Sequence, residues 1–309
     1  MKRVLVTGAT GFIGRHTLAP LAARGFEVHA VGHGEVPDAD GLAVAHRCDL
    51  MDDSAVADLI RAVAPTHLLH LAWYATPGRY WVAPENLDWV AASMRLYRTF
   101  AAAGGRRVVG AGTCAEYDWS HHTLIEGRTP YRPNTLYGIA KDGLRRVLIE
   151  AARLGDLSFG WGHVFFLYGP WEKPGRVVSD VALGCLRGEP VATSGGTQIR
   201  DFMHVEDVAG AFAALLDSPV EGSVNIASGE PRPLRDVISA VADAVGRPDL
   251  VRLGARPAPA NDPPCLAAAA TRLREEVGFR PAYDLETGIA ATVDWWRWRL
   301  QEQANKAER

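Results

Sequence analysis

Cysteine is scarce in this chain of 309 residues, and the four that occur, Cys48, Cys114, Cys185 and Cys265, lie far apart. No two of them form a CxxC pair, and this spacing argues against a zinc site and against a disulfide framework. We therefore expect reduced thiols and no bound metal ion.

Long apolar runs and a secretory signal are also lacking. The longest apolar runs, such as Ile289–Val293, fall far short of the ~20 residues that a membrane helix needs. The first residues, MKRVLVTG, combine two basic residues with a short strand-like run and do not resemble a signal peptide. We expect a cytoplasmic protein that does not enter a membrane.

Neither sign of charge dominates the composition. The formal net charge is −3, and no basic stripe runs along the sequence. Nucleic acid is therefore not an expected partner. Apolar residues make up 48% and charged residues 22% of the chain, as in ordinary globular proteins, so the chain can bury a substantial core.

Strand-like and helix-like segments alternate through the first two thirds of the chain. The expected strands are Arg3–Val6, Glu27–Val31, His67–Leu71, Arg107–Ala111, Gly162–Phe166 and Ser223–Ala227. The expected helices are Phe12–Ala23, Ser54–Val63, Leu87–Ala103, Tyr137–Leu154 and Val205–Leu216. This alternation predicts an α/β fold with a Rossmann-type, doubly wound parallel sheet.

A glycine-rich segment directly follows the first expected strand and opens the first expected helix. Gly8, Gly11 and Gly14 form a GxxGxxG pattern. Glycines let the loop turn tightly and let the backbone approach a pyrophosphate with no Cβ in the way. The helix N-terminus that follows, with Phe12 and Ile13, supplies N–H groups and a partial positive charge. This strand–loop–helix context predicts a dinucleotide site.

The sequence distinguishes less sharply between NAD(H) and NADP(H) as the dinucleotide. At the end of the second strand, where an acidic residue usually holds the ribose of NAD, the chain has Gly32 and then His33. Arg15 and His33 could hold a 2′-phosphate instead, although Arg15 also fits an exposed helix position. We expect Asp49 and Leu50 at the adenine edge. These residues favour NADP(H), with NAD(H) possible.

The C-terminal half is richer in proline and glycine, notably at Gly169–Gly175 and Ala255–Pro264. We expect a smaller C-terminal lobe that is interleaved with the last sheet elements and binds the substrate. The expected dinucleotide-binding domain comprises residues 1–168 and roughly 200–228, and the expected substrate lobe comprises residues 169–199 and 229–300. The polar tail, 301–309, is expected to fray.

A tyrosine and a lysine lie four residues apart on the helix that starts near residue 137. Tyr137 and Lys141 would share a helix face, where an ammonium lowers the pKa of a phenol. Such a tyrosine can exchange a proton while hydride moves to or from nicotinamide. The hydroxyl of Thr113, after the strand Arg107–Ala111, can face the same site.

Six ordered segments resemble the extended short-chain dehydrogenase/reductase family, specifically its nucleotide-sugar epimerases, dehydratases and 4-ketoreductases. They are TGATGFIG at 7–14, HLAW at 70–73, TCAEY at 113–117, YGIAK at 137–141, LYGP at 167–170 and RDFMHVED at 200–207. The resemblance covers almost the whole chain and implies a nucleotide-diphosphate sugar as substrate.

The resemblance also implies residue roles. Tyr137 would be the proton donor or acceptor, Lys141 would bind the nicotinamide ribose, and Thr113 would hydrogen-bond the reacting sugar oxygen. The remaining contacts implied for the cofactor are Leu71, Ala72, Trp73 and Phe165. Those considered for the substrate are Tyr74, in an aromatic loop, and Arg200 and Arg256, beside the diphosphate.

Two departures from the family patterns narrow the range of reactions expected of this chain. Its 4,6-dehydratases carry an Asp-Glu pair where this chain has Cys114 and Ala115. Its 3,5-epimerase/4-reductases carry a Cys and a His where this chain has Ala115 and Trp171. What remains is hydride chemistry at one carbon, which a 4-ketoreductase and a 4-epimerase both perform.

We therefore expect NADPH-dependent reduction of the C4 ketone of a nucleotide-linked 4-keto-6-deoxy sugar. An NAD-dependent nucleotide-sugar 4-epimerase is the alternative enzyme. A non-catalytic, cofactor-sensing protein is the alternative of another class, although such proteins commonly lose the tyrosine or the lysine. The helices Leu87–Ala103 and Tyr137–Leu154 resemble the family's dimerising pair, so we expect a homodimer, with core packing alone as the alternative.

Overall fold

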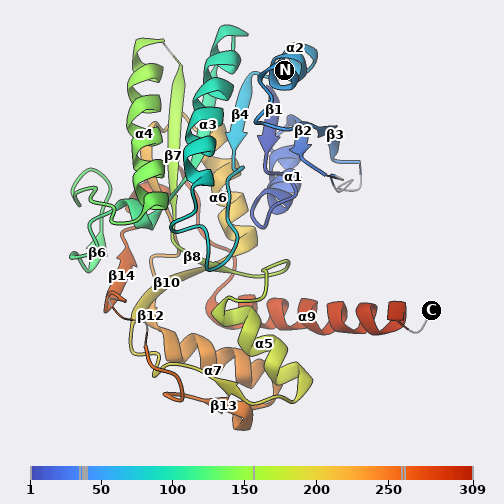
Figure 1. Cartoon of the computed structure of the whole chain (residues 1–309), viewed down its shortest axis with the longest axis vertical. Helices are drawn as coiled ribbons and strands as arrows, with labels where there is room; N and C mark the ends of the chain where they lie inside the picture. Colours follow the sequence, from blue (N-terminus) through green and yellow to red (C-terminus); the bar gives the residue numbers. More distant parts are fainter. Residues whose placement is uncertain are drawn as a thin grey trace.

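The centre of the molecule is a seven-stranded sheet whose strands all run parallel (Figure 1). This computed structural model describes residues 2–34, 36, 41–155, 157–258, 260 and 262–307. From one edge to the other, the strands are β11 (Gly222–Ile226), β7 (Ser158–Val164), β5 (Arg107–Thr113), β4 (His67–His70), β1 (Lys2–Thr7), β2 (Phe26–Gly32) and β3 (Ala43–Arg47).

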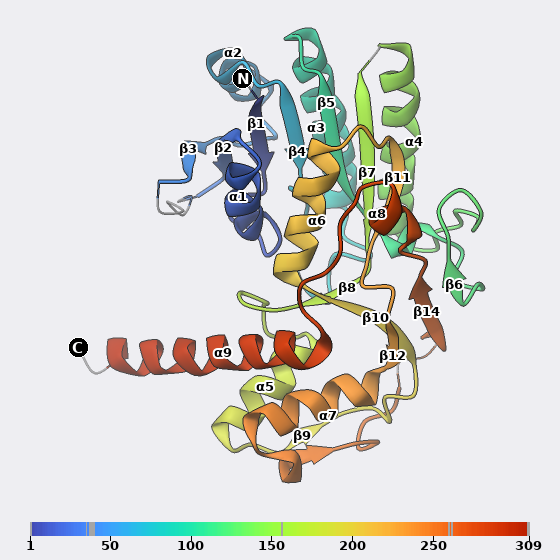
Figure 2. The same ribbon diagram turned by 180° about the vertical axis from the view of Figure 1, so that it is seen from behind.

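Helices cover both faces of this sheet. One face carries α2 (Asp53–Val63), α3 (Glu85–Ala102) and α4 (Leu136–Leu154), as Figure 1 shows. The other carries α1 (Gly14–Ala23) and α6 (Val205–Asp217), seen from behind in Figure 2. This arrangement confirms the expected Rossmann-type, doubly wound fold.

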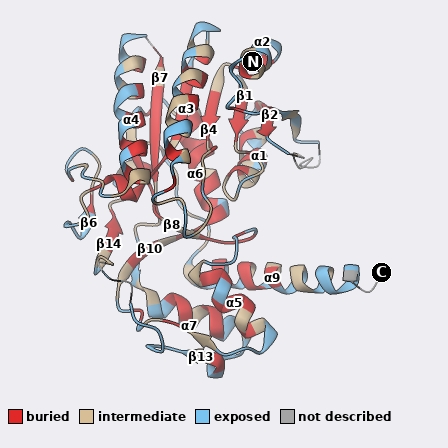
Figure 3. Cartoon of the chain, viewed as in Figure 1, coloured by how far each residue is buried: buried red, intermediate tan, exposed pale blue. Residues whose placement is uncertain are grey.

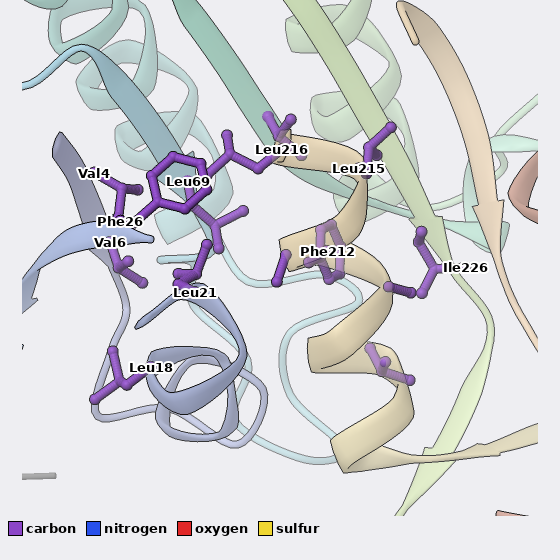
Figure 4. Packing of buried hydrophobic residues seen from close by; sticks show 14 of the residues in the cluster. Val4, Val6, Leu18, Leu21, Phe26, Leu69, Phe212, Leu215, Leu216 and Ile226 are labelled. Atoms are coloured by element: carbon purple, nitrogen blue, oxygen red, sulfur yellow. The ribbon is translucent and has the colours of Figure 1, made fainter. Parts of the chain in front are cut away.

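The sheet forms a buried core with the two helices behind it. The side chains of Leu18 and Leu21 on α1 lie beside β1, and Phe212 on α6 lies between the helix and β11 (Figure 4). Phe212 is fully buried, and its ring would be 2.6 Å from a Cβ on Gly162 of β7. Glycine at this position therefore makes room for the aromatic ring.

The chain leaves the main sheet after β7 and builds a second, smaller region below it. Its helices are α5 (Val177–Arg187), α7 (Leu234–Val245) and α9 (Leu285–Ala307), with a short α8 (Thr271–Glu275) nearer the main sheet (Figures 1 and 2). Its short strands are β6 (Thr123–Leu124), β8 (Phe166–Tyr168), β9 (Val191–Ala192), β10 (Ile199–His204), β12 (Pro231–Pro233), β13 (Val251–Arg252) and β14 (Cys265–Ala268). Single 3₁₀ turns lie at η1 (Cys114–Glu116) and η2 (Pro248–Leu250).

Two expectations about elements were wrong. The expected strand Gly162–Phe166 is divided at Phe165, because β7 ends at Val164 in the main sheet whereas β8 pairs with β10 in the smaller region. Of the tail that was expected to fray, residues 301–307 are helical, since α9 continues to Ala307. Its outer part projects from the body and is largely exposed, so the helix is held by the buried residues at its inner end (Figure 3).

Across the described residues, no helix combines the length and the apolar character that a membrane crossing requires.

Removal of the Phe212 side chain tests the packing between α6 and the sheet. Phe212→Ala should lower the free energy of unfolding by ~3–5 kcal/mol, because a fully buried ring leaves a cavity against β7 and β11. Denaturant unfolding followed by circular dichroism measures this change. Leu154→Ala is the control, since that side chain is 74% exposed at the end of α4. Equal effects of the two substitutions would contradict the packing described.

Candidate functional site

The glycine loop that follows β1 has no room for side chains. Gly8 has a φ of +71°, and a Cβ there would be 2.7 Å from the backbone nitrogen of Ala72. A Cβ on Gly14 would be 2.1 Å from the carbonyl oxygen of Gly8. The close approach of these backbone segments leaves an open cradle at the N-terminus of α1. Such a cradle fits the pyrophosphate of a dinucleotide.

A cleft of about 950 Å³ begins at this cradle and runs along the carboxyl edge of the main sheet. Most of the residues expected at the site line it, namely Gly8, Gly11, Phe12, Ile13, Gly14, Arg15, His33, Asp49, Leu50, Leu71, Ala72, Trp73, Tyr74, Thr113, Tyr137, Lys141 and Phe165. Residues that are distant in sequence thus share one cavity because the parallel strands end at the same edge.

The proposed catalytic side chains come from two neighbouring elements. Thr113 is the last residue of β5, and Tyr137 and Lys141 lie in the first two turns of α4. Thr135 caps α4, since its side chain accepts a hydrogen bond from the Gly138 N–H at 3.1 Å. This cap fixes the start of the helix, so that the phenol of Tyr137 and the hydroxyl of Thr113 line the same cleft.

Lys141 is buried against the end of the sheet. Its ammonium donates a hydrogen bond to the carbonyl of Ala111 at 2.8 Å and lies 3.7 Å from the ring centroid of Trp73. Burial lowers the pKa of Lys141 to about 7, and the carboxylate of Glu116 opposes this fall. The charge on this lysine therefore changes within the physiological pH range.

The expected lowering of the Tyr137 pKa is wrong for this structure. Burial raises the pKa of Tyr137 above its ordinary value, and the hydrogen bond with Thr113 only partly opposes the rise. Desolvation disfavours the phenolate, and the nearby Tyr80 and Glu116 disfavour it further. The phenol is therefore held in its protonated form, which suits a proton donor.

Arg15 and His33 line the cleft but already have partners. Arg15 donates to the carbonyls of Thr10 at 2.7 Å and Gly11 at 3.3 Å, so it braces the glycine loop. Its guanidinium also lies 3.9 Å from the ring centroid of Trp171. The exposed His33 has its Nε2 3.7 Å from a carboxylate oxygen of Asp49. Both side chains therefore already interact with other protein groups, so neither is an unengaged partner for a 2′-phosphate.

Arg200 and Arg256, the two arginines expected beside the diphosphate, do not line this cleft. Arg200 is buried, forms an ion pair with Asp262 at 2.5 Å, and lies 5.3 Å from the ring centroid of Phe166. It borders a separate groove, and Arg256 is exposed and lines neither cavity. Their placement depends on long-range pairing in the smaller region, which local sequence does not reveal.

Several cleft residues were missed by the sequence analysis. They are Glu172, Lys173 and Arg176, which line the cleft from the smaller region. Glu172 is buried and accepts a hydrogen bond from the Ser179 N–H at 3.0 Å, and burial raises its pKa to about 8. These residues lie in irregular segments with no motif, so only tertiary proximity identifies them.

The described residues contain no evident set of metal ligands. Within the part of the chain that the structure describes, no group of three or more His, Cys, Asp or Glu side chains is arranged to hold a metal ion.

Comparison with known proteins agrees with this geometry. The sequence profile of the NAD dependent epimerase/dehydratase family matches residues 4–227. This chain belongs to that family. The match includes the glycine loop, the end of β5 and the start of α4, so the elements that build the cleft are those of the family.

Relatives in the family act in more than one way. The chain is 26% identical to a UDP-glucose 4-epimerase of Rhizobium meliloti (strain 1021) over 96% of both proteins. It is 28% identical to a dTDP-4-dehydro-6-deoxy-D-allose reductase of Streptomyces bikiniensis, again over 96% of both. The relatives thus include both an epimerase and a reductase, and identity at this level does not separate them.

Among solved structures, MoeE5 in complex with UDP-glucose and NAD is 33% identical, with a TM-score of 0.81. It covers 96% of this chain and 99% of its own. A UDP-glucose 4-epimerase of Thermus thermophilus in complex with NAD is 29% identical, with a TM-score of 0.81 and the same coverage. Family membership and the cradle at the glycine loop together make this protein an enzyme of the nicotinamide-dependent oxidoreductase type.

A methyl group at Gly14 tests the cradle. Gly14→Ala should abolish binding of the dinucleotide, because the new Cβ collides with the carbonyl of Gly8 and displaces the loop. Cofactor fluorescence measures binding, and thermal unfolding shows whether the variant folds. Gly143→Ala in α4 is the matched control, since its added Cβ has no atom within 4 Å apart from its chain neighbours and the backbone of its own helix. Undiminished binding by a folded Gly14→Ala protein would contradict the assignment.

Proposed function

We propose that the protein catalyses the NADPH-dependent reduction of the C4 ketone of a nucleotide-linked 4-keto-6-deoxy sugar. The observation that carries the proposal is the meeting of Thr113, Tyr137 and Lys141 in the same cleft as the glycine loop. When bound, the reduced nicotinamide supplies the hydride. The protein must then supply a proton, hold the ketone and exclude water.

Each of the three side chains has one task in this scheme. Tyr137 delivers its phenolic proton to the C4 oxygen, in agreement with the raised pKa that keeps the phenol protonated. Thr113 donates a hydrogen bond to the same oxygen and polarises the carbonyl. The Lys141 ammonium, close to the tyrosine, stabilises the phenolate that remains until it regains a proton from solvent.

The cleft has features that suit a nucleotide sugar. Tyr74 and Tyr80 offer aromatic faces for a sugar or a base, and Lys173 and Arg176 offer positive charge for a diphosphate. Tyr80 and Arg176 lie together, with the guanidinium 6.0 Å from the ring centroid. These contacts replace Arg200 and Arg256 as the candidates for substrate binding in the cleft.

The preference for NADPH rests on the end of β2. At the position where a carboxylate would hold the ribose of NAD, the described residues are Gly32, His33 and Gly34, and Glu35 lies outside the described part. A Cβ on Gly32 would be 2.7 Å from the side chain of Thr10, so the loop leaves no space for a larger residue.

A second candidate is a nucleotide-sugar 4-epimerase that retains NAD. It is favoured by the related structures that contain NAD, of which two are 29% and 33% identical to this chain. The engagement of Arg15 with its own loop also weakens the case for a 2′-phosphate. An epimerase would use the same three side chains in both directions.

The absorbance of the reduced nicotinamide distinguishes the two enzymes. Purified protein is mixed with NADPH or NADH and a panel of TDP-, CDP-, GDP- and UDP-4-keto-6-deoxy sugars. A reductase oxidises NADPH stoichiometrically with one member of the panel. No net oxidation, together with NAD released when the protein is denatured, would contradict the reductase and support the epimerase.

Loss of the Tyr137 hydroxyl separates an enzyme from a cofactor sensor. Tyr137→Phe should lower kcat by ~10²–10⁴-fold, because the proton donor is gone, and should leave dinucleotide affinity nearly unchanged. Tyr283→Phe is the control, since that hydroxyl donates to Glu206 outside the cleft. Full turnover by Tyr137→Phe would overturn the assigned role, and a sensor would show no turnover in either form.

We also propose that the protein forms a homodimer through α3 and α4. Large apolar side chains are exposed along these adjacent helices, with exposures of 61% at Leu87, 53% at Ile139 and 52% at Val147. On α4, Ile139 and Val147 are eight residues apart and therefore lie on the same side of the helix. An isologous contact would bury both helices and their copies together.

A charge in this apolar face should disrupt the dimer. Val147→Glu should shift the mass in solution from dimer to monomer, because a carboxylate would be buried without a partner at the interface. Sedimentation equilibrium or light scattering measures the mass. Leu253→Glu, on an exposed position in the smaller region, should leave the dimer intact. A monomeric unmodified protein would contradict the proposal.

A further inference from the structure

A buried carboxylate lies directly behind the turn that carries Thr113. Glu116 is fully buried, and its Oε1 accepts a hydrogen bond from the Thr113 N–H at 2.7 Å. The Thr113 hydroxyl oxygen in turn accepts from the Ala115 N–H at 3.2 Å. This reciprocal pair closes the single turn η1 and fixes the Thr113 backbone where β5 ends.

The same carboxylate is linked to the surroundings of Lys141. The indole N–H of Trp161 donates to both oxygens of Glu116 at 3.1 Å, and the ring centroid of Trp161 lies 5.8 Å from the Lys141 ammonium. Lys141 donates to the carbonyl of Ala111, two residues before the N–H that Glu116 accepts. Glu116 and Lys141 therefore hold the end of β5 from two sides.

Gly112 lies between these two groups and makes their close approach possible. A Cβ at this position would be 2.1 Å from the indole nitrogen of Trp161 and 2.5 Å from Oε1 of Glu116. Any larger residue would push the carboxylate or the indole away from the strand. The packing thus holds the carboxylate and the indole close to the strand end that Lys141 also contacts.

Other charged and titratable groups surround the pair. On the Glu116 side, Arg145 Nε is 3.4 Å and His163 Nδ1 is 3.5 Å from a carboxylate oxygen. Arg145 also forms an ion pair with Asp142 at 2.6 Å, so its positive charge is shared between Asp142 and Glu116. On the Lys141 side lie Tyr137 and the buried His70, whose pKa is lowered to about 3 by burial and by Lys141, so the histidine is neutral.

We propose that Glu116 is a positioning residue that keeps Lys141 in its charged form and fixes the backbone of Thr113. This proposal rests on the proposed function, because it assumes that Lys141 and Thr113 serve that reaction. It applies equally to a reductase and to an epimerase, because both need the ammonium beside the tyrosine. A hydrophobic residue at position 116 would leave the Thr113 N–H without its acceptor and Lys141 without an anion to oppose its desolvation.

The small number of lysines allows a direct test without any ligand. The chain has four, Lys2, Lys141, Lys173 and Lys306, and all but Lys141 are exposed. Protein labelled with ¹³C at the lysine ε-carbon is titrated by NMR, and Lys141→Met assigns the Lys141 signal. In the unmodified protein this signal should titrate near pH 7.

Removal of the charge on Glu116 should move this titration to lower pH. In Glu116→Gln, which keeps a hydrogen-bond acceptor for Thr113, the Lys141 midpoint should fall by about one pH unit or more, because no anion opposes burial. Glu126→Gln is the matched control. Glu126 is another glutamate shielded from solvent, but it accepts from the Asn225 N–H at 2.6 Å and has no contact with the catalytic turn.

The titration can also refute the proposal. An unchanged Lys141 midpoint in folded Glu116→Gln would overturn it, as would an equal fall in Glu126→Gln. If thermal unfolding shows that Glu116→Gln does not fold, Glu116→Asp replaces it. Aspartate keeps the charge but withdraws it by one methylene, so the midpoint should fall less, and a midpoint that stays unchanged or rises would count against the proposal.

Turnover gives a second readout that separates this proposal from the function itself. With an active substrate, the alkaline limb of kcat in Glu116→Gln should move to lower pH, while KM for the sugar changes little. A shifted Lys141 titration without turnover in the unmodified protein would refute the proposed function and leave the role of Glu116 intact. Turnover with an unshifted titration would refute only the role of Glu116.

Discussion

The common direction of the strands in the main sheet is the constraint on which the site depends. Because β1, β4, β5 and β7 are parallel and in register, Thr7 lies beside His70, His70 lies beside Gly110, and Thr113 lies beside Val164. Their carboxyl ends therefore form one edge, and the segments that follow them converge there. The glycine loop, the aromatic segment after β4, the catalytic turn and Phe165 all reach the cleft for this reason.

Burial shifts the pKa values of the proposed catalytic groups at that edge. Desolvation raises the pKa of Tyr137 and lowers that of Lys141, so it favours the neutral form of both groups. The carboxylate of Glu116 opposes this effect at Lys141 but adds to it at Tyr137. Glu116 is itself paired with Arg145, which also pairs with Asp142. Buried charges are costly unless they are paired. Glu116, Arg145 and Asp142 accordingly form a network in which each residue has a partner of opposite charge.

The smaller region completes the cleft by means that leave little trace in the sequence. The chain passes from β7 to β8 at Phe165 and so changes from one sheet to another within a single expected strand. Glu172, Lys173 and Arg176 then line the cleft from irregular segments of that region. Arg200 shows the opposite case: its motif was recognisable, but its side chain is committed to Asp262 in a different groove.

The strands of the main sheet except β3, the glycine loop and the spacing of Tyr137 and Lys141 could be predicted from the amino-acid sequence. These features are local: apolar periodicity sets helices and strands, glycine sets the tight loop, and a separation of four residues sets a shared helix face. The continuation of α9 to Ala307, the side chains that close the cleft and the direction of the Tyr137 pKa emerged only in the folded molecule. Burial and electrostatic environment arise from residues far apart in the chain, so no local pattern encodes them.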